Sequence, residues 1–165
     1  MPETLDAFTM WLKATELSEA IRNSQWLWPV CEIAHFTGLS LLVGAIGFFD
    51  LRLLGAFRAV PLQAAWSFMP WGKLGFAIAA VTGVIFFVGA PDQYINNVAF
   101  YAKLAFLVLA GINAAVFELF YKRALATSPG AETSPALRTI AIVSIVSWFF
   151  VIYWGRMLPF VGNAF

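Results

Sequence analysis

The chain has 165 residues, of which 61% are hydrophobic, 17% aromatic and 12% charged. Soluble domains average roughly 45–50% apolar and about 25% charged residues, so this composition excludes an ordinary soluble domain and indicates an integral membrane protein. The formal net charge of +1 gives no support for nucleic acid binding, and the single cysteine, Cys31, excludes an internal disulfide and a multi-cysteine zinc site.

The first 25 residues hold four carboxylates and two basic residues, with no continuous apolar core. We therefore expect no cleavable signal peptide, and we expect Met1 to stay on the mature protein. Apolar side chains recur near helical spacing at Leu5, Phe8, Trp11, Leu12 and Ile21. This pattern predicts an amphipathic helix that lies on the membrane surface.

Four later segments are apolar enough and long enough to cross a bilayer, which takes about 20 helical residues. They cover about residues 26–49, 71–90, 100–121 and 137–160. The intervening stretches predict a loop with a short interfacial turn at 51–70, a tight connection at 91–97 and a polar turn at 126–135. The expected fold is all-α, a single transmembrane domain over residues 1–165. It is an antiparallel integral membrane four-helix bundle, preceded by the interfacial helix.

Basic residues indicate the orientation. With the N-terminus outside, six basic residues fall on the inner side and four on the outer side. The inner six are Arg52, Arg58, Lys73, Lys122, Arg123 and Arg138, and the outer four are Lys13, Arg22, Lys103 and Arg156. The positive-inside rule then favours both termini on the periplasmic or exterior face.

Glu32 and His35 are ionisable residues inside the first apolar segment. They are three residues apart and so share a helix face. Ionisable side chains are costly in hydrocarbon and are therefore candidates for function. We expect both to face an outer-side pocket with Lys103 and Arg156. His35 would be the ligand or proton carrier, Glu32 its orienting partner, and the two bases anion clamps. The alternative is a structural network, with Glu32 paired to Lys103 or Arg156 and His35 hydrogen-bonded to a neighbouring helix.

The pocket suggests several cofactors. His35 is a candidate axial ligand for haem b, with Met157, a subunit partner or nothing in the sixth position, because His35 is the only histidine. A quinone headgroup is a second candidate. Copper is a third, because Cys31, His35 and Met157 offer the ligand types that suit Cu(I). The remaining alternative is that no cofactor binds.

Small residues in the first two segments have two interpretations. They are Gly38, Gly44, Gly47, Gly72, Gly75, Ala79 and Gly83. They could form a slot for a flat cofactor, but close packing between helices is favoured, because small residues at four-residue spacing let backbones approach.

Other polar residues are interpreted as structural. Asp50 and Arg52 are predicted to be anchors at the end of the first helix. Glu118 precedes Lys122 by four residues, the favourable order for a helical ion pair. Asn113 is predicted to hydrogen-bond to another helix.

The motifs "WLWPVCEIAHFTGLSLLVG", "DLRLLG" and "YINNVAFYAKLAFLVLAGINA" together resemble a family of small, uncharacterised bacterial inner-membrane proteins. The resemblance implies a four-helix membrane bundle with a histidine in the first helix, and a second histidine late in the third helix. This chain has Phe117 and Glu118 in that region, which departs from a two-histidine haem site. The His-x-x-Gly pattern at His35 is also similar to copper-resistance D-type proteins and to bacterial haem-synthesis membrane oxidases.

The leading hypothesis is a cofactor-associated membrane subunit of a redox system in the bacterial inner membrane, acting in electron transport. One alternative is a non-catalytic accessory or assembly subunit of a larger membrane complex, or a homo-oligomer. Another is a small transporter or copper-handling protein. The sequence leaves open whether the protein is an enzyme.

Overall fold

The computed structural model describes residues 2–122 and 134–161, so the predicted polar turn at 126–135 lies almost wholly outside the described residues. Within these ranges the secondary structure is helical, with no β-strand. The long helices are α3 (Leu27–Leu53), α5 (Met69–Gly89), α7 (Val98–Val116, continued by the π-helical turn η1, Phe117–Tyr121) and α9 (Pro135–Val161). By length and composition, four helical segments of the described chain could cross a membrane, at positions close to those predicted.

The ends of these helices follow from local chemistry. Helix α5 carries Pro70 in its first turn, where the missing N–H costs nothing, and it ends at Gly89, shortly before Pro91. Helix α7 is capped by Asn97, whose side-chain oxygen accepts from the Ala99 amide at 2.9 Å. Between α3 and α5, the predicted interfacial turn is the short helix α4 (Leu62–Trp66).

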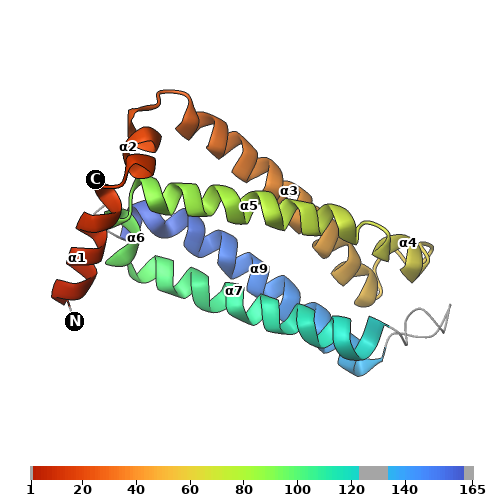
Figure 1. Ribbon diagram of the computed structural model, residues 1–165. Helices are drawn as coiled ribbons and strands as arrows, with labels where there is room; N and C mark the ends of the chain where they lie inside the picture. The colour runs from red at the N-terminus through yellow and green to blue at the C-terminus, as the bar shows by residue number, and fades with distance from the viewer. Residues whose placement is uncertain (1, 123–133, 162–165) are drawn as a thin grey trace.

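The long helices are arranged as two pairs (Figure 1). Helix α3 packs along α5, helix α7 packs along α9, and the pairs meet chiefly through α3 and α9. At one end, here called the α1 end, lie α1 (Pro2–Lys13), α2 (Glu16–Asn23) and the short helix α6 (Asp92–Ile95). Helix α4 and the π-turn η1 lie at the opposite end, here called the α4 end.

The N-terminal segment forms two helices where the sequence predicts one. Thr15 begins the second helix, because its side-chain oxygen caps the Ser18 amide at 3.3 Å. Helix α1 lies across the end of the long helices (Figure 1), and Lys13 forms an ion pair with Asp92 of α6. Phe8 and Trp11 remain exposed on α1, whereas Leu12 and Ile21 of the same apolar pattern are buried.

Helices α3 and α5 are in backbone contact through glycines. A Cβ added to Gly38 would lie 2.8 Å from the Gly75 carbonyl oxygen and 3.1 Å from the Ala79 amide nitrogen. Gly72 is buried against Ala45 in the same interface. Close packing, the favoured interpretation, is therefore correct for Gly38, Gly72, Gly75 and Ala79. Gly44 and Gly47 have open space beside them.

Helices α7 and α9 are joined by aromatic and polar contacts. Phe106 and Phe150 stack with ring centroids 4.7 Å apart. The Asn113 side-chain amide donates to the Ile140 carbonyl at 3.1 Å, which confirms the predicted interhelical hydrogen bond. At the α4 end, a buried apolar cluster of Phe49, Leu53, Ala65, Met69, Phe117 and Ala141 ties the two pairs together.

Candidate functional site

His35 is held by helix α5. Its Nδ1 lies 2.7 Å from the Thr82 hydroxyl oxygen. That hydroxyl has one proton, which it donates to the Ile78 carbonyl at 2.7 Å. With the hydroxyl proton on the Ile78 carbonyl, Thr82 accepts from His35 Nδ1–H, and in this tautomer Nε2 is the basic nitrogen of the ring. The hydrogen bond to a neighbouring helix, one of the two alternatives for His35, is present, with Thr82 as a partner that the sequence did not identify.

Glu32 lies apart from the predicted basic partners. It is exposed, and it accepts a hydrogen bond from the Trp28 indole N–H at 3.2 Å. The ion pairs within residues 2–122 and 134–161 do not link Glu32 to Lys103 or Arg156. Tyr94 of α6 lies close enough to Glu32 for an electrostatic interaction. Burial, and then the Glu32 carboxylate, raise the pKa of the Tyr94 phenol, which stays neutral.

The other predicted pocket residues occupy two different environments. The Lys103 ammonium packs against α9, 3.7 Å from the position that a Cβ on Gly155 would take, and it lies near enough to His35 for the two to interact electrostatically. Arg156 is exposed, with its guanidinium 4.9 Å from the centroid of the Phe160 ring. Met157 follows it and is partly buried. The structure thus places His35 near Lys103, while Glu32 and Arg156 have other contacts.

Metal-ligating side chains are dispersed. In the part of the chain that the structure describes, no three His, Cys, Asp or Glu residues gather closely enough to hold a metal ion. Cys31 is a buried free thiol, as its position in an apolar run predicts. His35 is therefore a single potential ligand, without a preformed set of protein ligands around it.

A cavity lies at a different level, towards the α4 end. Its volume is about 280 Å³, close to the small end of ligand pockets. All four long helices line it, together with α4 and η1. The lining residues of α3 and α9 are buried, like Leu42 and Ser144, or partly buried. Phe76 of α5 and Gly111 and Ala114 of α7 are exposed. Helices α5 and α7 are not a closely packed pair, so the cavity opens sideways between them.

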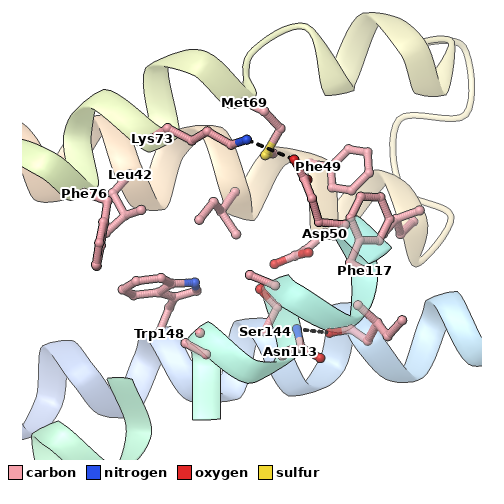
Figure 2. Close-up of a pocket in the computed structure, with 18 of the residues that line it drawn as sticks. Leu42, Phe49, Asp50, Met69, Lys73, Phe76, Asn113, Phe117, Ser144 and Trp148 are labelled. Carbon is pink, nitrogen blue, oxygen red and sulfur yellow. Dashed lines mark hydrogen bonds and ion pairs between the residues drawn. The ribbon is translucent and has the colours of Figure 1, made fainter. Parts of the chain in front are cut away.

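Asp50 is the charged side chain at the centre of this cavity (Figure 2). The residue is only 4% exposed, and its Oδ2 atom has no hydrogen-bond partner in the described residues. Ser144 of α9 lies beside the carboxyl group (Figure 2). The interpretation of Asp50 as a helix-end anchor is therefore wrong: α3 continues to Leu53, which places Asp50 inside the helix and turns it inward.

An ion pair lies at the mouth of the cavity. Lys73 of α5 contacts the Glu118 carboxylate of η1, the continuation of α7, at 3.1 Å. The Lys73 side chain and its contact are drawn in Figure 2. Lys122 contacts the same oxygen at 2.9 Å, which confirms the predicted pair between residues four apart. Lys73 was not predicted as a partner. Both lysines thus contact Glu118, and neither forms an ion pair with Asp50.

A signal for the cavity existed in the sequence. Leu42, Ile46, Phe49, Asp50 and Leu53 have the spacing of one helix face, and four of them are apolar. An acidic residue within such a stripe indicates a carboxylate that faces other helices. Arg52 lies off this stripe, and its Nε donates to the Val60 carbonyl at 2.5 Å in the loop after α3.

The chain belongs to the family described as a family of unknown function, DUF6644, whose model matches residues 29–161. The match begins in the first turns of α3 and ends with α9, so it contains His35 and all residues that line the cavity, while α1 and α2 precede it. No curated protein and no solved structure matches the chain. The functional argument therefore depends on the site itself.

Proposed function

We propose that this DUF6644 protein is inserted in a membrane and binds a small lipid-soluble molecule in the cavity around Asp50. The observation that carries the proposal is a buried carboxyl oxygen with no partner, facing a cavity of about 280 Å³. Buried polar atoms are nearly always paired, and an ionisable group without a counter-ion is costly within the membrane. A ligand that completes the contacts of Asp50 accounts for both the cavity and the unpaired atom.

The route into the cavity supports a ligand that arrives through lipid. Phe76 on α5 is 44% exposed while also lining the cavity, and Gly111 on α7 is likewise an exposed lining residue. In a bilayer this side of the molecule would face acyl chains. We place the protein in the bacterial inner membrane, with the α1 end on the periplasmic or exterior side. The support is the basic side chains near the α4 end, which include Arg52, Arg58 and Lys122.

The test is to fill the cavity. A small neutral diazirine hydrocarbon, photoactivated in proteoliposomes, should label the α3 and α7 segments that line it. Gly111→Phe should block this labelling, because nothing lies within 4 Å of the Cβ position at Gly111 and the ring can turn into the cavity. Gly44→Phe is the matched control, since its Cβ position is equally free but outside the cavity lining. If Gly111→Phe leaves the labelling of the α3 and α7 segments unchanged, the cavity takes up no ligand.

A second candidate function concerns His35. Its Nε2 is free to bind once Nδ1 bonds to Thr82, which supports a hydrogen-bonded quinone headgroup or a single axial bond to haem b. Haem would have to lie away from the α3–α5 interface, because the backbones of Gly38 and Gly75 are in contact there. In this proposal the protein is a redox subunit, alone or in a larger complex. The absorbance spectrum of the purified protein tests it: a Soret band lost in His35→Ala would support haem, and a quinone would be found by extraction and mass analysis.

A further inference from the structure

We propose that the ligand of the Asp50 cavity is a small hydrophobic organic cation, of the quaternary or protonated amine class. This inference rests on the proposed function, since it names the chemistry of the molecule that the same cavity takes up. Two features of the lining carry it: a carboxyl group without a resident counter-ion, and aromatic rings on both sides of that group.

The first feature is the missing counter-ion. Lys73 is the basic residue that lines the cavity, and its ammonium is 3.1 Å from Glu118. Arg52, two residues after Asp50, donates instead to the Val60 carbonyl. The ion pairs of the described chain do not include Asp50. A cationic ligand would supply the missing charge, whereas an anionic ligand would meet an uncompensated negative group.

The second feature is aromatic. Figure 2 shows Asp50 between Phe49 and Phe117 on one side and Trp148 on the other. Phe49 and Phe117 pack edge to face, with centroids 5.4 Å apart, and Phe76 packs against Trp148 at 6.4 Å. The faces of such rings attract cations, most strongly where water is excluded. An ammonium group that reaches Asp50 would therefore lie between aromatic rings.

A neutral hydrogen-bond acceptor would find less in this site. It would need donors: the Asn113 amide already donates to the Ile140 carbonyl at 3.1 Å, which leaves the Trp148 indole N–H as a neutral side-chain donor of the lining. Asp50 itself is an acceptor when ionised. The lining therefore favours a ligand that combines positive charge with an apolar body over a ligand that carries only carbonyl groups.

The experiment compares two ligands of the same shape. Benzyltrimethylammonium and neopentylbenzene differ in having a cationic nitrogen or a neutral carbon at the branch point. The competition of each ligand with the diazirine probe is measured on the unmodified protein and on the Asp50→Asn protein. The ratio of the two values is used for each ligand, because partition into lipid is the same for both proteins and cancels. We expect Asp50→Asn to weaken the cation at least about tenfold, as for a desolvated charge contact, and to change neopentylbenzene by less than about twofold.

The controls separate the possible failures. Glu32→Gln removes an exposed carboxylate at the α1 end and should leave both ligands unchanged. If Asp50→Asn fails to fold, the unmodified protein still decides, because phenylmethanesulfonate, an anion of similar size, should not compete. The cation assignment would be overturned if the cation and the anion competed equally well. It would also be overturned if a folded Asp50→Asn protein bound benzyltrimethylammonium and neopentylbenzene more weakly by the same factor. If the diazirine probe labels none of the segments that line the cavity, the proposed function itself is refuted.

Discussion

Gly75→Ala should loosen the contact between α3 and α5. A Cβ at this position would lie 2.6 Å from the Leu42 amide nitrogen and 2.9 Å from the Leu41 Cβ, and it would also collide with the Gly38 carbonyl oxygen. Ordinary contacts of a Cβ begin at 3.4 Å, so the shortfall against the Leu42 nitrogen is 0.8 Å. Because the obstacles are backbone atoms, no side-chain rotation relieves them, and the two helices must move apart.

The expected size follows from two opposing effects. Overpacking a well-packed interface costs about 1–3 kcal/mol. Replacing glycine by alanine inside a helix returns up to about 1 kcal/mol through backbone entropy. Three contacts at once are shorter than 3.0 Å, so the cost should lie in the upper half of that range, about 2–3 kcal/mol, and we expect Gly75→Ala to lower the free energy of unfolding by about 1–2 kcal/mol. At Gly44, where nothing lies within 4 Å of the Cβ position, the same change should be neutral or slightly stabilising.

The chain supplies its own probe for this measurement. Cys31 is its single cysteine and is 5% exposed on α3, so a thiol-reactive fluorogenic dye should report the opening of α3 during a thermal ramp in detergent. A change of 1 kcal/mol shifts the melting temperature of a chain of this size by about 2–4 °C. The expected fall is therefore about 2–8 °C for Gly75→Ala, and more for Ala79→Leu. A melting temperature within 1 °C of the unmodified protein for Gly75→Ala, or an equal fall for Gly44→Ala, would refute the glycine contact.

Two further predictions concern charged residues. Lys73→Ala should raise both the entry and exit rates of a cavity ligand by about two- to fivefold, the range of an exposed ion pair, because Lys73 reaches Glu118 across the open side. Lys122→Ala is the control, because Lys122 contacts the same carboxylate but does not reach across the open side. Stopped-flow binding should find the entry and exit rates of this variant unchanged. Equal effects of the two substitutions would show that the Lys73–Glu118 pair is not a gate. For Glu32 and Arg156, a double-mutant cycle of Glu32→Gln and Arg156→Met, measured by unfolding in detergent, should be additive within about 0.5 kcal/mol, since the residues have different partners. A coupling above 1 kcal/mol would mean that the two side chains meet.

Much of the fold can be predicted from the sequence because its determinants are local. Apolar runs of bilayer length specify four long helices, and Pro91 and Asn97 set where α5 ends and α7 begins. Contacts within one helix could be predicted for the same reason: Glu118 and Lys122 are neighbours on any helix with that spacing.

The candidate site was decided by tertiary structure. A helix that is apolar on every face carries little information about which face turns inward or which helix lies beside it. The sequence alone therefore could not assign Thr82 to His35, or Lys73 to Glu118. Asp50 shows this dependence most clearly. Its spacing in the sequence places it on an apolar face of α3. Its carboxyl group becomes the buried centre of a cavity only because α3 packs against α9 while a side remains open between α5 and α7.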